Sequence, residues 1–495
     1  MKRAINALVA VLATVAMAVA GFMGAGTAFA DEANTITGPK NGHIYEAYQI
    51  FTGDLADGKL SNVKWGSATA KNGTAVTDAE LKTVTDLASK SVNDNAQATA
   101  NAIAAYLTSD AQPTATIDDT NPTAQVPSGY YLIKDKNNTV PDGQAATTYI
   151  VTVAGNVTIT PKSDVPSFEK KLKDTNDTTG ETSDWQDSAD YDINDAVPFK
   201  LEGTVASNYA DYDTYYFAFH DVEENSLTFN KDSVKVYVDD TEITSGYSVV
   251  TEGLTDGCTF EVKFANLKTI DGVKAGSKIR VEYTSTLNEN AVLGKHGNVN
   301  KAKLQFSNNP NDSQNGETSP TGETPWDNVI VFTYKTVINK VDDKNQPLKG
   351  AEFTLSKKMK DGSTKNVAVV KDSEGTTFTF NGLDDGDYVL TETKTPAGYN
   401  SIKPITFTVT ANHTITWEGE DRDTILTSLS GNAASGEITF TPTDDKSELD
   451  TNVVNKPGSS LPETGGVGTI VLYAAGAVLV IAAGVYFGLK KKNAR

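Results

Sequence analysis

A lysine and an asparagine that can form an amide bond, and an acid that can assist them, lie in short, strand-like stretches of this sequence. In the stretch SFEKKL, a strand places Lys170 on the same face as Phe168 and Leu172, because alternate residues of a strand share a face. The same alternation groups Asp221 with two phenylalanines in FAFHDV, and Asn300 with alanine, leucine and phenylalanine in NKAKLQF. Apolar neighbours mark a buried face, so we expect a lysine, an acid and an asparagine in one core.

A lysine, an acid and an asparagine that are buried together have a defined chemical use. Burial lowers the pKa of the lysine and raises that of the acid, so both groups can be neutral. The neutral amine can then attack the carboxamide carbon of the asparagine while the protonated acid polarises its carbonyl. Ammonia leaves and a Lys–Asn isopeptide bond remains. Alternation alone leaves open that the three are ordinary residues of separate strands.

The last third of the sequence repeats this arrangement. Tyr388, Leu390 and Glu392 alternate in YVLTET, which again places an acid on an apolar face. The segment opens with the stretch VINKVD, which contains Lys340, and closes with TNVVN, which ends at Asn455. A lysine, an acid and an asparagine are therefore present here as well.

The first thirty residues predict export. Lys2 and Arg3 precede a mostly apolar stretch, and the run Ala28-Phe29-Ala30 offers small residues two apart. This is the layout of a secretory signal peptide over residues 1–30. A membrane helix is the alternative, but the apolar core is short and ends in glycine-rich sequence. We expect the mature chain to start at Asp31, outside the cytoplasm.

The other end of the chain contains the pentapeptide LPETG. It is followed by an uncharged stretch to Leu489, long enough to span a bilayer, and then by a basic tail. This order resembles the sorting signal of Gram-positive cell-wall proteins, which sortases read. The resemblance implies that a sortase cysteine attacks the Thr464 carbonyl and that an amine resolves the acyl-enzyme. The cleavage motif comprises Leu461, Pro462, Glu463, Thr464 and Gly465.

Composition excludes several partners and reactions. The net charge of the whole chain is −21, from 43 basic and 64 acidic residues. Six of the basic residues lie in the signal peptide and the tail, so the mature chain has 37 basic and 64 acidic residues and a net charge of about −27. Such a charge argues against nucleic acid or an anionic membrane as a partner. The four histidines are scattered, without the spacing of a zinc site or a catalytic triad, so we expect neither a hydrolase nor any other enzyme. They are His43, His220, His296 and His413.

No cofactor or metal ion is expected. Asp190, Asp192 and Asn194 could hold calcium, but the stretch lacks the glycine of a calcium loop, so a solvated turn is preferred. Cys258 is the one cysteine, which excludes an internal disulfide, and we interpret it as a small buried apolar residue.

Short β-type runs bounded by Gly, Asn, Asp and Thr predict a mainly β fold of tandem Ig-like β-sandwich domains. Helical spacing is confined to residues 78–90 and 93–107, within the N-terminal domain. Prolines and polar stretches suggest the boundaries. The expected segments are a signal peptide (1–30), an N-terminal domain (31–165), a middle domain (166–334), a C-terminal domain (335–458) and a sorting signal (459–495).

Two motifs make a family resemblance specific. LxGAxFxL over residues 348–355 and YxLxETxxPxGY over residues 388–399 resemble the collagen-adhesin B-type domain, and the second is similar to the E-box of Gram-positive pilins. The resemblance implies a bond between Lys340 and Asn455, assisted by Glu392. For the middle domain it implies Lys170 bonded to Asn300, assisted by Asp221. The stretch GHIYEAYQIF also resembles the N-terminal domain of shaft pilins.

Each bond is expected to join the first and last strands of its domain, closing loops of about 130 and about 115 residues. Shaft pilins also carry a polymerisation lysine in a Tyr-Pro-Lys-Asn-like motif. Thr160-Pro161-Lys162-Ser163 occupies that place here, with threonine and serine as departures from the motif. Because proline ends a strand, Lys162 is expected to stand exposed at a domain junction. Lys170 and Lys171 are the nearest rival nucleophiles.

The resemblance therefore implies a structural subunit of a covalent pilus. A class C, pilus-specific sortase is expected to join Thr464 of one subunit to Lys162 of the next, and a housekeeping sortase to anchor the polymer to peptidoglycan. The expected partners are other copies of the chain, these sortases, peptidoglycan, tip or base pilins and host surface ligands, but no nucleic acid. The alternative is a monomeric wall-anchored adhesin that binds a host protein or glycan.

Overall fold

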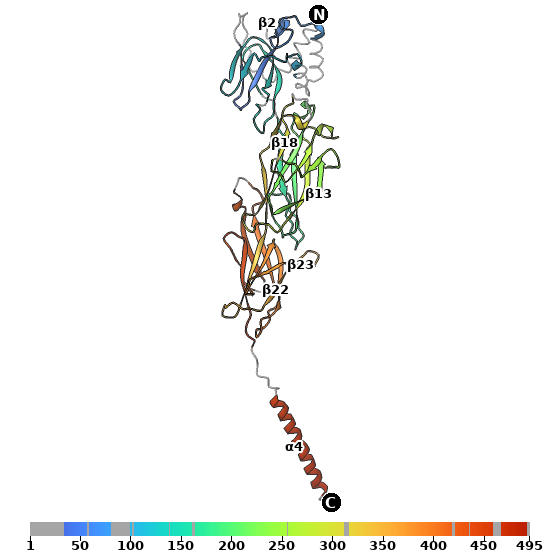
Figure 1. The fold of residues 1–495 in the computed structure, drawn as a ribbon, viewed down its shortest axis with the longest axis vertical. Coiled ribbons are helices and arrows are strands. Elements are labelled where there is room, and N and C mark those ends of the chain that lie inside the picture. The colour runs from blue at the N-terminus through green and yellow to red at the C-terminus, as the bar shows by residue number, and fades with distance from the viewer. Residues whose placement is uncertain are drawn as a thin grey trace.

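The computed structural model describes residues 34–492 except 57–58, 81–99, 101–102, 138, 161–163, 255, 311–315, 418–420, 435 and 459–466. Figure 1 shows three β-rich domains in a row, with helix α4 (Val467–Lys492) beyond the third. The predicted mainly β fold is confirmed. The expected helices over 78–90 and 93–107 lie largely outside the described residues, as do the signal peptide, Lys162 and the LPETG motif.

The N-terminal domain is built from two sheets, one ordered β5-β1-β8 and the other β3-β2-β6-β7, with β4 paired to β2. Its core divides into an aromatic cluster around Trp65 and a second cluster around Tyr131. Among its described residues, no lysine is buried. The strands are β1 (Asn34–Thr37), β2 (Tyr45–Ala56), β3 (Lys59–Trp65), β4 (Ala115–Ile117), β5 (Thr123–Val126), β6 (Gly129–Asp135), β7 (Thr148–Val153) and β8 (Val157–Thr158).

The middle domain is a sandwich of a sheet ordered β14-β13-β17-β11-β9 and a sheet ordered β10-β20-β18-β12-β16-β15, with β19 paired to β18. Strict alternation in β17 and β18 places every second side chain in a shared core. The strands are β9 (Ser167–Leu172), β10 (Ser188–Asp190), β11 (Ala196–Thr204), β12 (Phe217–Glu223), β13 (Leu227–Val238), β14 (Thr241–Ile243), β15 (Ser248–Val250), β16 (Phe260–Phe264), β17 (Lys278–Leu287), β18 (Asn298–Ser307), β19 (Thr321–Glu323) and β20 (Asp327–Phe332).

The C-terminal domain pairs a sheet ordered β24-β25-β21-β30-β29 with one ordered β23-β22-β26-β27-β28. Its first and last long strands, β21 and β30, are parallel neighbours. The strands are β21 (Tyr334–Val341), β22 (Glu352–Lys358), β23 (Thr364–Val367), β24 (Val369–Lys371), β25 (Thr377–Leu383), β26 (Gly386–Lys394), β27 (Ile405–His413), β28 (Leu426–Ala433), β29 (Thr441–Pro442) and β30 (Glu448–Val454).

Four short 3-10 helices lie in the described loops of the middle and C-terminal domains. They are η2 (Tyr209–Asp211), η3 (Leu267–Thr269), η4 (Gly316–Thr318) and η5 (Arg422–Thr424). Within the part of the chain that the structure describes, no helix has both the length and the apolar character needed to cross a membrane.

A buried ion cluster joins the middle and C-terminal domains. The backbone N–H of Asp384 donates to Asp192 Oδ1 at 3.0 Å, and the Lys357 ammonium contacts both carboxylates. Asp192 is only 3% exposed, so the solvated turn expected around it is wrong, because the third domain docks onto that turn. Gly382 fits there because an added Cβ would lie 2.5 Å from the Ile193 side chain, and its φ of +76° favours glycine.

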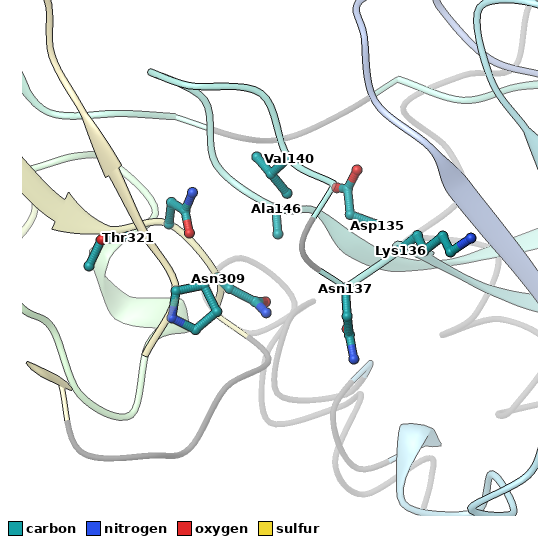
Figure 2. A pocket seen from close by; sticks show the side chains of 9 residues that line it. Asp135, Lys136, Asn137, Val140, Ala146, Asn309 and Thr321 are labelled. Carbon is teal, nitrogen blue, oxygen red and sulfur yellow. The ribbon is translucent and has the colours of Figure 1, made fainter. Parts of the chain in front are cut away.

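The N-terminal and middle domains also contact each other. The Ala146 N–H donates to the Asn308 carbonyl oxygen, and a pocket of about 250 Å³ lies beside this bond. Figure 2 shows side chains of both domains around the pocket, with Asp135, Lys136 and Asn137 on one side and Asn309 and Thr321 on the other. The residues that line this pocket do not form a cluster of nucleophilic or charged side chains.

Candidate intramolecular crosslink sites

The middle domain brings Lys170, Asp221 and Asn300 together from three strands. Lys170 lies on β9, the edge strand of one sheet, while β12 and β18 of the facing sheet supply Asp221 and Asn300. All three residues have 0% relative exposure. The Lys170 side chain therefore crosses the core from one sheet to the other, as alternation on each strand predicts.

A tyrosine hydroxyl connects the three groups. The Lys170 ammonium nitrogen Nζ lies 2.5 Å from Asp221 Oδ2 and donates to the Tyr283 hydroxyl at 2.7 Å. That hydroxyl donates to Asp221 Oδ2 at 2.7 Å and accepts from Asn300 Nδ2 at 3.0 Å. The lysine nitrogen and the asparagine amide thus both lie within 3.0 Å of one oxygen atom.

Burial favours the neutral form of each titratable group here. Desolvation lowers the pKa of Lys170, although Asp221 opposes the shift, and desolvation raises the pKa of Asp221 against the effect of Lys170. Burial, and next the charge of Asp221, raise the pKa of Glu223 to about 8. The phenol of Tyr283 also has a raised pKa because it is fully buried. A neutral amine beside a protonated carboxyl is the state that amide exchange requires.

Asp221 and Asn300 each have one side-chain oxygen atom without a partner among the described residues. These atoms are Asp221 Oδ1 and Asn300 Oδ1, and both are buried. Leaving a buried acceptor unpaired costs roughly 1–3 kcal/mol. A proton on Asp221 directed to Asn300 Oδ1 would satisfy one oxygen of each residue, and the same hydrogen bond would polarise the carbonyl for attack.

The C-terminal domain places its lysine and its asparagine at the ends of two parallel strands. Lys340 is on β21 and Asn455 directly follows β30, which pairs Lys340 with Val453 in register. Lys340 Nζ donates to the carbonyl oxygens of Val341 and Val453 at 2.9 and 3.0 Å. Asn455 Nδ2 donates to both oxygens of Glu392 at 2.8 and 3.1 Å.

Exposure differs between the members of this second site. Lys340 and Asn455 are fully buried, whereas Glu392, on β26 of the facing sheet, is half-buried. Burial lowers the pKa of Lys340 to about 8, although Glu392 and Asp342 oppose the shift. Asn455 Oδ1 is buried and has no partner among the described residues. In this site Glu392 accepts hydrogen bonds from the Asn455 amide nitrogen, and Lys340 donates to two backbone carbonyl oxygens.

One expectation about the middle domain is wrong. Asn300 is not on the last strand of that domain, because β19 and β20 follow it and both pair with β18. No further strand is expected from the sequence between the polar stretch after β18 and the boundary at 334/335, yet β20 returns to the same sheet there. A crosslink from Lys170 to Asn300 would still connect the two sheets, since β9 packs beside β18 and β20.

Sequence reasoning missed Tyr283 and Glu223. Tyr283 faces the core in the strictly alternating strand β17, and Glu223 follows Asp221 by two residues on β12. Glu223 Oε1 accepts a hydrogen bond from Ser285 and lies 3.4 Å from Asn300 Nδ2. The alternation of strand residues could have identified both, because Tyr283 and Glu223 share a face with apolar or buried neighbours in the same way as Asp221 does.

The rival nucleophiles near Lys162 are occupied. Lys170 is buried in the core, and Lys171 Nζ forms an ion pair with Asp187 at 2.6 Å. On either side of Lys162, which is outside the described residues, the chain is fixed. The Ile159 N–H donates to the Thr37 carbonyl oxygen at 2.7 Å, and Asp164 Oδ2 accepts from the Ser207 N–H at 2.8 Å.

Two family models match the chain. Residues 334–423 match a prealbumin-like fold domain, and residues 453–494 match the LPXTG cell wall anchor motif. Over 390 residues the chain is 26% identical to the trypsin-resistant surface T6 protein of Streptococcus pyogenes serotype M6, covering 67% of this chain and 70% of that protein.

Solved pilin structures are similar in fold. The T6 backbone pilin of serotype M6 Streptococcus pyogenes has a TM-score of 0.51 and 19% identity, over 87% of this chain and 100% of that chain. The major pilin SpaD from Corynebacterium diphtheriae has a TM-score of 0.48 and 20% identity, over 86% and 98%. At these identities the likeness concerns the fold.

Proposed function

We propose that this chain, an LPxTG-anchored protein of the shaft-pilin type that is secreted and held at the cell wall, is polymerised by a class C sortase. Thr464 of one subunit is joined to Lys162 of the next, and a housekeeping sortase finally transfers the polymer to peptidoglycan. The cell wall anchor motif and the pilin relatives support the shaft role. The anchoring of the chain on both sides of Lys162 supports this lysine as the acceptor.

The polymerisation step is an acyl transfer. The sortase thiolate displaces the Gly465 amine from the Thr464 carbonyl, which breaks the Thr464–Gly465 bond and forms a thioester. The Lys162 amine of a second subunit then attacks that thioester, an amide forms and the sortase thiol is released. The chain itself supplies the two reacting ends and the sortase supplies the catalysis.

Within each subunit we propose two further amide bonds. Lys170 Nζ bonds to the side-chain carbon Cγ of Asn300, the bond from Cγ to Nδ2 breaks, and ammonia leaves with a proton that passes through Asp221. The observation that carries this proposal is the shared Tyr283 hydroxyl, which holds the amine, the acid and the amide in one dry core. Lys340 and Asn455 react in the same way, assisted by Glu392, which holds the leaving amide nitrogen.

These bonds suit a shaft that bears tension. A covalent crosslink that closes a loop of about 100 residues stabilises by roughly 4–5 kcal/mol in the chain-entropy model. In the C-terminal domain the bond joins parallel strands β21 and β30, so that force along the chain passes through it. In the middle domain it joins the two sheets across the core.

The polymerisation proposal is tested by replacing Lys162 with arginine, which keeps the charge but removes the amine nucleophile. We expect the high-mass, SDS-resistant ladders in wall extracts to disappear, with a single wall-linked species remaining. The matched control is Lys136→Arg, an exposed lysine of the same domain, which should leave the ladder unchanged. A persisting ladder in Lys162→Arg would overturn Lys162 as the acceptor, and a single monomer band in the unmodified chain would favour a monomeric adhesin.

A further inference from the structure

A cluster of four potential metal ligands lies in the middle domain, on the opposite face of β12 from the crosslink residue Asp221. His220 is on β12 and Glu261 is on β16, and the two are directly paired in register. Asp256 and Cys258 come from the segment that connects β15 to β16. The cluster combines the imidazole, thiol and carboxylate donors that zinc prefers in proteins.

The donor atoms are close to the spacing of a tetrahedral site. Zinc bond lengths of about 2.0–2.3 Å place tetrahedral ligands about 3.4–3.6 Å apart. Cys258 Sγ lies 3.6 Å from His220 Nδ1, and Glu261 Oε1 lies 3.4 Å from the same nitrogen. Asp256 Oδ2 lies 2.7 Å from His220 Nδ1 and 3.0 Å from Cys258 Sγ, which are hydrogen-bond distances. To admit an ion the Asp256 carboxylate must move outward, and Glu261, which lies outside the compact group of His220, Asp256 and Cys258, must turn toward that group.

Burial also directs the histidine toward the cluster. His220 is 5% exposed and Glu261 is 7% exposed, so both are fixed by the sheet. His220 Nε2 is buried without a partner among the described residues, so the ring makes its polar contacts through Nδ1, which faces the other three ligands. Cys258 and Asp256 lie at the solvent side, with Cys258 partly exposed, which leaves a path for the ion.

We propose that His220, Asp256, Cys258 and Glu261 form a binding site for a zinc-class divalent ion. On binding, the ion forms bonds to His220 Nδ1, Cys258 Sγ and the two carboxylates, the thiol proton passes to solvent, and the hydrogen bonds to Asp256 break. The interpretation of Cys258 as a small buried apolar residue is therefore wrong, because it is partly exposed and donates to Asp256 at 3.0 Å. The scattered histidines hid the site, since its members meet only through strand register.

The ion would fasten the β15–β16 segment to the centre of the sheet. That segment already contacts β12 through the Thr259 N–H, which donates to the Asp221 carbonyl oxygen at 2.7 Å. At His220, one residue away, zinc would replace the existing hydrogen bond to Asp256 with coordination bonds to both sides of the contact. It would also protect the thiol of a secreted chain from oxidation, because the thiolate would be coordinated.

The test uses the purified full chain, freed of metal and then given one equivalent of zinc chloride. Because Cys258 is the one cysteine, the rate of its alkylation by iodoacetamide reports on this site alone. We expect one zinc per chain by elemental analysis and alkylation at least about tenfold slower. Calcium chloride, a cation that prefers oxygen ligands, should not slow the reaction. An unchanged alkylation rate with zinc would overturn the proposal.

Variants assign the ligands. Cys258→Ser and His220→Ala should each lower the zinc affinity at least about tenfold. Asp240→Asn, an exposed carboxylate in the turn between β13 and β14, is the matched control and should bind zinc as before. Equal zinc binding by Cys258→Ser and the unmodified chain would place the ion elsewhere and overturn the assignment. The alkylation measurement needs no variant, so a misfolded variant cannot obscure the result.

Discussion

The two proposed crosslink sites combine the same kinds of residue in different surroundings. In the middle domain the lysine, its acid and its asparagine are fully buried and share a tyrosine hydroxyl. In the C-terminal domain the acid, Glu392, is half-buried and the lysine rests on two backbone carbonyls. The first site forms only when two sheets close on each other, whereas the second needs chiefly the pairing of β21 with β30. The residues for the proposed Lys–Asn reaction can thus be positioned either inside a core or at the ends of paired strands.

The largest effect is expected from removing the acid of each site. Asp221→Ala should abolish the middle crosslink and remove one buried hydrogen-bond acceptor of the Lys170 amine, which costs about 1–3 kcal/mol beyond the lost crosslink. Glu392→Ala should abolish the C-terminal crosslink without a further loss of stability, because solvent reaches that site. Urea unfolding of the two variants measures the difference. If the two variants lost the same amount of stability, the difference proposed here between the buried middle site and the half-buried C-terminal site would be contradicted.

The next effect concerns the tyrosine that only the middle site contains. Tyr283→Phe removes the hydroxyl that contacts Lys170, Asp221 and Asn300. We expect the middle crosslink to form more slowly, while the C-terminal one forms at its usual rate. Mass spectrometry of peptides at intervals after synthesis follows each bond separately. Tyr237→Phe, on the neighbouring strand β13 of the same sheet, is the control, and an unchanged middle rate in Tyr283→Phe would show that the hydroxyl is dispensable.

The smallest effect is a pH dependence of the C-terminal reaction. The pKa of Lys340 is lowered to about 8, so the reactive neutral amine becomes more abundant as the pH rises toward that value. Crosslink formation in freshly refolded chain should accelerate about tenfold per pH unit below pH 8 and level off above it. The measurement is the rate of ammonia release in the Asn300→Ala variant, which reports on the C-terminal site alone. A rate that falls with rising pH would contradict a neutral lysine as the nucleophile.

The two-residue period of the strands carried most of what the sequence could predict. It placed Lys170, Asp221 and Asn300 on buried faces, and it applies equally to Tyr283. It failed after β18, because the strand that contains Asn300 is expected to be the last of its domain although β20 returns to the same sheet. Periodicity within a strand says nothing about which strand pairs with which after a loop.

Features made by tertiary contact were beyond the sequence. Asp192 looked like part of a solvated turn, yet it lies against Lys357 because the C-terminal domain docks there. Cys258 and His220 are far apart in the chain and meet because β16 pairs with β12 in one particular register. Neither arrangement has a local pattern, since both depend on how separate elements pack.

The central claim is that each subunit contains two amide bonds between side chains, and the intact mass of the purified chain tests it most directly. Each bond releases one ammonia, so the account predicts a mass about 34 Da below that of the same chain with free side chains. Asn300→Ala and Asn455→Ala should each recover about 17 Da, after correction for the substitution. A mass equal to that of the uncrosslinked sequence would contradict the account.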